Sequence, residues 1–447
     1  MTQIDTVPGS DIKPWLLQAP KKYLFINANI VDVEVGKIAK DASLATNQGK
    51  IEAVYSSTPN SPNDYIVVDC RGKYLCPGLF DAHVHLCATP GFSDLSGAFG
   101  NPNDVSLLRQ PYVASQMLYR GFTSVRDCGG AQLPLKEAID DGVFPGPRLF
   151  IAGHALSQFG GHGDLRSPYD QNECCGGHSG HLGRLCNGIP ECMAAVRNEI
   201  RCGADFIKIM ASGGVASPTD KLEQLQFTSS EIKAMTECAE NAGTFVTAHA
   251  YTSKAIRHCI ANGVKGIEHG NFVDPPTAKL MVENGIYLTP TLITYSQMAS
   301  ERWKGYLPPE SRAKNTQVLR AGLEALKIAS EAGVTMCYGS DLLGPLGAAQ
   351  TQEFSLRSQV LSPLEILRSA TINPAKMMSC QDSLGQLKEG FHADILLLEG
   401  NPLENVTLFD KPDRHVLAVM KGGRVYRSQW KTLPVDGEVP VRFNALL

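Results

Sequence analysis

The chain reads Pro77-Gly78-Leu79-Phe80-Asp81-Ala82-His83-Val84-His85 at the end of a short apolar run. Side chains alternate along a β-strand with a period of two, so His83 and His85 are expected to face the same way. Imidazole is a common ligand of zinc and similar ions, and two imidazoles at one strand end form half of a metal site. The alternative is that they are simply two polar residues at the end of a strand.

A lysine lies inside a second apolar run, Ala204-Asp205-Phe206-Ile207-Lys208-Ile209-Met210, which is typical of a buried parallel strand. Burial can lower the pKa of a lysine, and the neutral amine can add carbon dioxide to give a carbamate, an anionic ligand able to bridge two cations. Two other interpretations stay open here. Lys208 could extend to solvent from an edge strand, or it could be buried beside an acidic side chain.

Three further polar residues close short apolar runs. His249 ends the run 243–249, His269 ends 264–269, and Asp341 ends 334–341. Any one of them could be an ordinary loop residue. Together with His83, His85 and Lys208, however, they make six potential ligands at strand ends, which predicts a two-metal site.

The middle of the chain repeats a pattern of an amphipathic stretch, a glycine and a short apolar run. Glycine suits the left-handed position that ends a helix, so each instance predicts a helix stop before a strand. The spacing from Thr228 to Glu231 predicts a capping box, and Asp274-Pro275 predicts an N-cap followed by proline. The glycines of the pattern are Gly121, Gly203, Gly243, Gly263, Gly285 and Gly333.

Eight strands are predicted near 77–85, 122–127, 148–153, 204–211, 244–249, 264–269, 286–290 and 334–340. Eight strand–helix units over roughly 300 residues favour an α/β fold, a closed parallel (β/α)8 TIM barrel at 77–384 with its site at the C-terminal face. The alternative is an open doubly wound sheet. That fold would need a phosphate-binding glycine-rich turn after an early strand, and the sequence has none.

The two ends of the chain alternate apolar and polar residues like antiparallel strands, at 23–33 and 49–55 and again at 393–398 and 416–420. Neither end has enough sequence for a core of its own. We therefore expect residues 1–76 and 385–447 to pair into one small β-sandwich domain beside the barrel.

These motifs resemble the amidohydrolase superfamily, and the resemblance covers nearly the whole chain. Within the superfamily, five segments of this chain resemble one branch in particular. This branch consists of imidazolonepropionase-like and Xaa-Pro dipeptidase-like amidases and includes ochratoxinase. The five segments are Thr123-Ser124-Val125-Arg126-Asp127, Phe206-Ile207-Lys208-Ile209-Met210-Ala211-Ser212-Gly213-Gly214-Val215, His249-Ala250-Tyr251, Ile267-Glu268-His269-Gly270 and the ending Gly385-Gln386-Leu387-Lys388-Glu389-Gly390-Phe391-His392-Ala393-Asp394.

The resemblance implies a division of roles among the six ligands. His83, His85 and Asp341 would hold one divalent ion, His249 and His269 the other, and Lys208, carboxylated at N6, would bridge them. Zinc is the expected metal. A metal-bound hydroxide would attack the scissile carbonyl, and Asp341 would orient that nucleophile, accept its proton and pass it to the leaving amine.

Substrate specificity is expected from the loops that follow the strands, of which 154–190 is the longest and has no predicted structure. It carries His162, which matches the His-Gly-Asp segment of the family and is the candidate for gripping the substrate carbonyl or its oxyanion. Tyr251 resembles the tyrosine that contacts a substrate carboxylate in dipeptidase relatives. The weaker substrate-binding candidates are Arg166, Lys221 and Tyr295, and each could instead be a solvated loop residue.

The same loop holds a second group of potential ligands, namely Cys174, Cys175, His178, His181 and Cys186. A separate zinc site is conceivable there. However, the spacing does not match the paired Cys-x-x-Cys frame, and a glycine-rich loop collects polar residues for flexibility.

Composition limits the class of partner. A chain of 447 residues that is 43% hydrophobic can bury a large core. The formal net charge of −4 argues against a nucleic-acid surface or a basic membrane patch. The resemblance implies a small-molecule amide or dipeptide as the partner. Barrels of the branch that this chain resembles often assemble, so a homo-oligomer is expected as well.

Thirteen scattered cysteines indicate free thiols rather than a disulfide framework. The first ten residues lack the pattern of a signal peptide, and no stretch approaches 18 apolar residues. A cytoplasmic location is therefore expected, unless a leader for secretion has been removed.

Three hypotheses follow for the function. The first is a zinc-dependent amidase or carboxypeptidase that splits the amide of an N-acyl amino acid or dipeptide. The second is hydrolysis of a cyclic amide such as imidazolonepropionate. The third is a non-catalytic binding protein on the same fold, which the complete set of six ligands disfavours.

Overall fold

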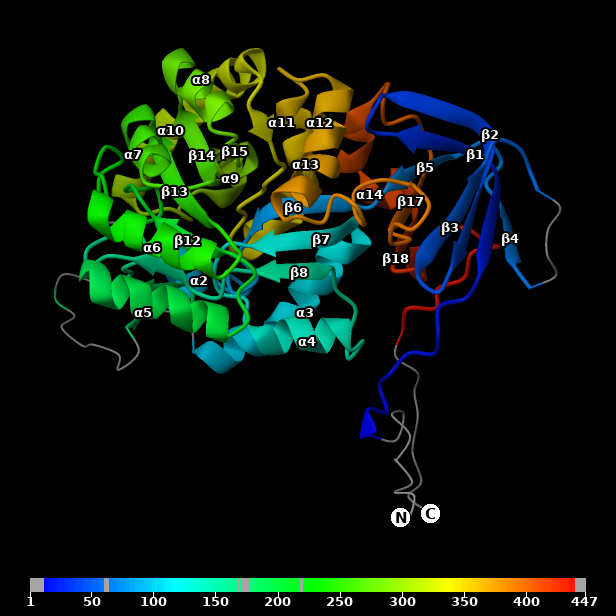
Figure 1. The fold of residues 1–447 in the computed structure, drawn as a ribbon, viewed down its shortest axis with the longest axis horizontal. Coiled ribbons are helices and arrows are strands. Elements are labelled where there is room, and N and C mark those ends of the chain that lie inside the picture. Colours follow the sequence, from blue (N-terminus) through cyan, green and yellow to red (C-terminus); the bar gives the residue numbers. More distant parts are fainter. Residues whose placement is uncertain are drawn as a thin grey trace.

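The computed structural model describes residues 12–59, 64–100, 102–166, 169, 177–179, 181–217 and 220–438. Figure 1 shows two parts: strands surrounded by helices on one side, and on the other a sheet in which the blue N-terminal strands lie beside the orange and red C-terminal ones.

The eight predicted central strands are present, each within a few residues of its expected place. They are β6 (Leu79–Val84), β7 (Phe122–Asp127), β8 (Arg148–Ile151), β12 (Ile207–Met210), β13 (Val246–Thr252), β14 (Gly266–Phe272), β15 (Tyr287–Thr289) and β16 (Thr335–Met336). β6, β7 and β8 form one parallel sheet, and β12 to β16 run in sequence order through another. Their residues are almost entirely buried, as expected for parallel strands covered on both faces.

Backbone hydrogen bonds join the edges of these two sheets. The Asp205 N–H donates to the Ile151 carbonyl at 2.7 Å, next to β8 and β12. On the other side, the Ala82 N–H of β6 donates to the Tyr338 carbonyl just beyond β16, also at 2.7 Å. The parallel strands are therefore in contact at both edges of the pair of sheets.

Helices and 3-10 turns connect the strands and cover them (Figure 1). The α-helices are α2 (Leu95–Gly100), α3 (Asn103–Tyr119), α4 (Leu133–Asp140), α5 (Gly188–Arg201), α6 (Ser229–Asn241), α7 (Ser253–Ala261), α8 (Pro275–Glu283), α9 (Leu292–Ala299), α10 (Pro309–Ala332), α11 (Glu353–Arg357), α12 (Pro363–Ser369), α13 (Ile372–Met377) and α14 (Pro412–His415). The 3-10 turns are η1 (Glu301–Trp303), η2 (Gly344–Gln352) and η3 (Val406–Asp410).

Local sequence signals account for the helix ends. Thr228 forms the predicted capping box with Glu231 at the start of α6. The Asp274 side chain accepts from the Thr277 N–H at the start of α8, which is followed by proline as predicted. All six glycines of the repeated pattern have positive φ, for example Gly333 at 83° directly after α10.

The loop 154–190 is not without structure, which corrects one expectation. It contains three short strands, β9 (Ala155–Ser157), β10 (His178–Ser179) and β11 (Gly183–Leu185). β11 pairs in parallel with β9, and β9 pairs with β12 through Leu156 and Ile209. Strands of two or three residues are too short to produce a periodic pattern of apolar residues, so these strands could not be predicted.

The two ends of the chain contribute strands to one sheet of eight. The strands are β1 (Tyr23–Asp32), β2 (Lys37–Asn47), β3 (Lys50–Tyr55), β4 (Ile66–Asp69), β5 (Tyr74–Pro77), β17 (Ile395–Leu398), β18 (Val416–Lys421) and β19 (Arg424–Ser428). The order is β19-β18-β17-β5-β1-β2-β3, with β4 also paired to β1. β17 and β5 pair antiparallel, and they join the two ends of the chain.

No described helix is long and apolar enough to cross a membrane. The eleven cysteines that the structure describes are all free thiols, and nine of them are buried. This confirms the expectation of free thiols for these eleven.

Candidate metal centre

The C-terminal ends of the parallel strands bring the predicted ligands together. His83 lies at the end of β6, Lys208 in β12, His249 in β13 and His269 in β14. All six predicted ligands line one cavity: His83, His85, Lys208, His249, His269 and Asp341. Because the cavity lies where parallel strands end, the register of the strands alone places these side chains side by side.

Three of the ligands form a tight group. His83 Nε2 lies 3.3 Å from His85 Nε2 and 3.5 Å from Asp341 Oδ1, and His85 Nε2 lies 3.4 Å from the same oxygen. Ligands at about 2.0–2.2 Å from a tetrahedral zinc ion lie roughly 3.3–3.6 Å from one another. These three atoms are therefore spaced as the ligands of one cation.

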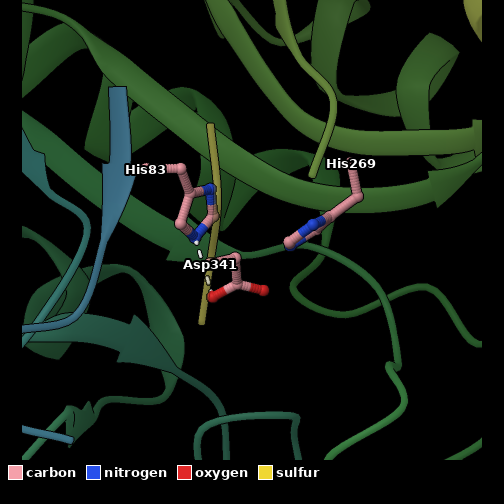
Figure 2. A group of neighbouring side chains, drawn as sticks. All are labelled: His83, His269 and Asp341. Carbon is pink, nitrogen blue, oxygen red and sulfur yellow. Dashed lines mark ion pairs between the residues drawn. The ribbon is translucent and has the colours of Figure 1, made fainter. Parts of the chain in front are cut away.

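His269 approaches the same group from β14, as Figure 2 shows. Its ring nitrogen, a ring nitrogen of His83 and a carboxylate oxygen of Asp341 all lie within 4.8 Å of one another. His83 and Asp341 thus lie between His85 on one side and His269 on the other. His83, His269 and Asp341 are therefore close enough to hold a metal ion together.

Fixed hydrogen bonds orient three of the imidazole rings. His83 donates through Nδ1 to Glu268 Oε2 at 2.7 Å, and His85 donates through Nδ1 to the Gly129 carbonyl at 2.8 Å. His269 Nδ1 lies 2.8 Å from Thr291 Oγ1. In each of these three rings Nδ1 has a hydrogen-bond partner, and Nε2 is the nitrogen that can bind a metal.

His249 is oriented in the opposite sense. Its Nε2 lies 3.3 Å from the Gly213 carbonyl, so Nδ1 is the nitrogen left for a metal. The ring centroids of His249 and His269 lie 4.6 Å apart at 71°. The two residues that were predicted to share a cation are therefore neighbours, with their rings edge to face.

The histidines are held in the form that binds metals. Burial, together with the charge of Lys208, lowers the pKa of His83 to about 4. Burial also lowers the pKa values of His85, His249 and His269 well below the ordinary value. The rings are therefore neutral at physiological pH, and a metal can bind without displacing a proton.

Asp341 responds to burial in the opposite direction. Burial raises the pKa of its carboxyl to about 8, and the nearby Lys208 only partly offsets that rise. A cation beside this carboxyl would favour its ionised form. The donor set thus has the chemistry of a cation site.

Lys208 is 1% exposed and lines the cavity. Among the described residues, no carboxylate oxygen lies within 4.0 Å of the Lys208 Nζ. The close charged pairs of the site are His83 with Glu268, and Asp341 with both His83 and His85. This burial does not fit the alternative of a lysine exposed to solvent. The charge of Lys208 acts on two nearby carboxyls, because it opposes the rise in the pKa of Asp341 and helps to lower the pKa of Glu268. The alternative of a lysine buried beside an acidic side chain therefore fits this position.

Glu268 and Arg126 form a buried pair directly behind His83. Arg126 donates to Glu268 Oε1 at 2.5 Å and to the Ala82 carbonyl at 2.6 Å, and both side chains are fully buried. Burial alone would raise the pKa of Glu268, but Arg126 and His83 outweigh it and hold that pKa well below its usual range. His83, Cys128 and Glu268 also lie close enough to hold an ion, but the Arg126 guanidinium already supplies the positive charge there.

Two tyrosines complete the wall next to His269. The Tyr251 ring stacks on the His269 ring, with centroids 5.1 Å apart. Its hydroxyl lies 2.8 Å from the Tyr295 hydroxyl, which in turn lies 3.0 Å from His269 Nδ1. Both tyrosines line the same cavity as the predicted metal ligands.

His162 also reaches the cavity, although it comes from the loop after β9. Its ring stacks on His249 with centroids 4.3 Å apart, and its Nδ1 lies 3.1 Å from Asp220 Oδ2. Burial alone would raise the pKa of Asp220, but His162 and Lys314 outweigh it and lower that pKa. Asp220 is therefore ionised at neutral pH and holds one edge of the His162 ring.

Two predictions on the same loop have a different outcome. The Arg166 guanidinium forms two bonds of 2.8 Å to the Asp164 carboxylate, and Arg166 is absent from the described lining of the cavity. The substrate-binding role of Arg166 therefore stays a prediction, and the structure shows its guanidinium paired with Asp164. Cys174, Cys175 and the side chain of His178 lie outside the described residues, and so does the second zinc group that includes them.

Several site residues were not predicted from the sequence. Three of them contact predicted residues directly: Glu268 contacts His83, Thr291 contacts His269 and Asp220 contacts His162. Lys314 contacts Asp220. Glu268, for example, is 185 residues from His83. Glu268 adjoins His269 in the Ile267-Glu268-His269-Gly270 segment, and this was the one available signal. Thr291 and Lys314 lie in no motif, so only the fold reveals them.

Comparison with known proteins gives consistent matches. The Amidohydrolase family matches residues 74–426. Ochratoxinase from Aspergillus niger is 32% identical over 421 residues, which cover 91% of this chain and 87% of that protein. Among solved structures, an amidohydrolase is 43% identical with a TM-score of 0.88 and covers 92% of this chain and 100% of its own. A prolidase complexed with N-methylphosphonate-L-proline is 41% identical, with the same TM-score and coverage.

The residues matched by the family include every predicted metal ligand, from His83 to Asp341. The match confirms the resemblance to amidohydrolases that was seen in the sequence motifs. Because it spans most of the sequence, this chain belongs to the amidohydrolase family.

Proposed function

We propose that this protein is a binuclear-metal amidase that cleaves an N-acyl amino acid or a dipeptide and releases the C-terminal amino acid. The observation that carries the proposal is the group of His83, His85 and Asp341 ligand atoms, 3.3 to 3.5 Å apart in a cavity that Tyr251 also lines. Family membership supports a hydrolase. The names of the similar proteins, ochratoxinase and prolidase, favour amide or peptide bonds.

His83, His85 and Asp341 would hold one divalent ion, and His249 with His269 the other, with carboxylated Lys208 between them. Zinc suits the neutral imidazoles and the carboxylate of this set. When bound, the two ions supply Lewis acidity and an activated water. The neutral histidines and the burial of Lys208 in the wall of the same cavity support this assignment.

Asp341 would move the proton of the reaction. In the proposed step, water adds to the amide carbon, its proton passes to Asp341, and the C–N bond breaks as that proton reaches the leaving nitrogen. Asp341 is the one carboxylate among the described residues that lines the cavity, which makes it the candidate to carry the proton between the two transfers. His162 would contact the carbonyl oxygen, since its Nδ1 is committed to Asp220 and Nε2 remains available.

Tyr251 would bind the substrate carboxylate through its hydroxyl. The rest of the cavity wall is largely apolar, and among the described residues Asp341 is the only carboxylate that lines it. The apolar wall residues are Leu165, Leu182, Met210, Val215, Ala216, Met298 and Leu343. A basic side chain of the substrate would find no acidic partner in the described lining other than Asp341, which is a proposed metal ligand. We therefore infer that the cavity prefers substrates with uncharged, apolar side chains.

We also infer that the eight parallel strands close into a (β/α)8 barrel. The hydrogen bonds from Asp205 to Ile151 and from Ala82 to Tyr338 support closure at both edges. The single sheet formed by the two chain ends supports the composite domain of 1–76 with 385–447, and we infer that this sheet curls into the expected sandwich.

A mass-spectrometric hydrolysis panel tests the proposed reaction. Zinc-loaded protein is incubated with N-acyl phenylalanines including ochratoxin A, with Xaa-Pro and Xaa-Lys dipeptides, and with imidazolonepropionate. Release of free phenylalanine or proline, with Xaa-Lys cleaved more slowly, is the expected result. Turnover of imidazolonepropionate alone would instead support a cyclic-amide hydrolase, and no turnover at all would favour a non-catalytic binding protein.

A further inference from the structure

A buried ammonium group braces one wall of the cavity from a distant helix. Lys314 lies in α10, and only 14% of its side chain is exposed. Its Nζ donates to the carbonyl oxygens of Gly214 at 2.7 Å, Ser217 at 2.6 Å and Asp220 at 3.0 Å. It also lies 3.5 Å from Asp220 Oδ1. Four oxygens of the segment after β12 therefore converge on one charge.

Asp220 links Lys314 to His162 through hydrogen bonds. Its Oδ2 accepts from His162 Nδ1 at 3.1 Å and from Gln226 Nε2 at 3.2 Å. Gln226 Oε1 in turn accepts from the His162 backbone N–H at 2.9 Å. The ring and the backbone of His162 are thus fixed by two side chains that are bonded to each other.

The faces of the His162 ring are confined as well. A side-chain carbon at Gly214 would lie 2.3 Å from ring atom Cε1, so the bare glycine backbone packs directly against the ring. Another contact of the ring is the stack on His249, at 4.3 Å. Since Lys314 holds the carbonyl of Gly214, a shift of this segment would move the surface on which His162 rests.

We propose that Lys314 is a positioning residue for His162, acting through Asp220 and Gly214. This inference deepens the proposed function and depends on it, because His162 is the group assigned to the substrate carbonyl. The predicted ligand imidazoles have their own partners, such as Glu268 for His83 and Thr291 for His269. Loss of the Lys314 charge should therefore lower kcat more than it changes KM or metal content.

Lys314→Met tests the proposal, and Lys327→Met in the same helix is the matched control, because Lys327 is 55% exposed. Both substitutions are made in the wild-type chain and in a His162→Ala chain. Lys314→Met is expected to lower kcat at least tenfold in the wild type and less than twofold in the His162→Ala background. An equal loss in both backgrounds would show a general structural role and overturn the proposal.

Hydrogen exchange gives a readout that needs no activity. Lys314→Met is expected to speed amide exchange at 157–166 and 220–227, whereas Lys327→Met leaves both segments unchanged. Unchanged exchange in Lys314→Met would overturn the bracing role even if the enzyme is active. A wild-type chain that cleaves no amide would overturn the proposed function, and the exchange data would then still decide whether Lys314 positions His162.

Discussion

The Nδ1 atom of His83 lies 2.7 Å from Oε2 of Glu268, the residue that precedes His269 in β14. One strand therefore supplies both a predicted ligand of the second ion and the group that orients a ligand of the first. Arg126, bonded to the other oxygen of the same carboxylate, keeps Glu268 ionised.

Glu268→Gln should lower metal affinity and kcat/KM by about 10- to 100-fold, because a ligand histidine depends on its hydrogen-bonded carboxylate for orientation and basicity. Metal affinity is measured by competition with a chromogenic chelator. Glu353→Gln is the matched control, since Glu353 forms an equally buried pair with Arg357 away from the cavity. Equal metal affinity in the two variants would contradict the orienting role.

Lys208→Ala should lose bound metal and activity together, because the bridging ligand is removed from between the two cations. Bound metal is measured by elemental mass spectrometry. The control is Lys327→Ala, which replaces an exposed lysine. Wild-type apoprotein reconstituted without carbon dioxide should also regain less activity than apoprotein given bicarbonate. Two tightly bound ions per chain in Lys208→Ala would rule out the bridge.

Tyr251→Phe should raise KM roughly tenfold for substrates with a free C-terminal carboxylate, in line with the loss of one hydrogen bond to a charged group. The same substitution should change KM little for the corresponding C-terminal amides. Tyr306→Phe is the control, because the buried Tyr306 hydroxyl donates to the Leu343 carbonyl and does not line the cavity. A rise in KM that is equal for acids and amides would argue against carboxylate recognition.

Glu199→Gln should lower the free energy of unfolding at pH 7 by about 1–3 kcal/mol, because a buried acceptor of charged groups is lost. Burial alone would raise the pKa of Glu199, but bonds from His154 and Arg184 outweigh it and lower that pKa below the ordinary 4.5. The stabilisation is therefore fully present above pH 4.5 and is lost as the pH falls through the folded-state pKa. Denaturant unfolding at several pH values should show the two proteins converging in acid, and a constant difference would contradict the pairing.

The sequence was sufficient for the features that depend on neighbouring residues. Gly333 and Thr228 mark helix ends by their own conformational preferences, and the apolar run around Lys208 predicts its strand. Strand ends at one face of a parallel sheet then bring the six ligands together. For these features the local chemistry and the tertiary structure agree.

What the sequence could not reveal depends on contacts between distant segments. Lys314 and Asp220 lie 94 residues apart, and no local pattern distinguishes Lys314 from an exposed helical lysine such as Lys327. Arg166 shows the reverse case, since a carboxylate two residues away at Asp164 binds a side chain that was assigned to the substrate. Side-chain pairing of this kind is decided by three-dimensional packing.

The proposed hydrolysis requires two bound metal ions, and a metal titration measures this requirement. Metal is removed with a chelator, zinc is added back in steps, and hydrolysis of the best substrate of the panel is measured at each step. Activity should be absent without metal and should reach its maximum at two zinc ions per chain. Full activity in the metal-free protein, or a maximum at one ion per chain, would contradict the account.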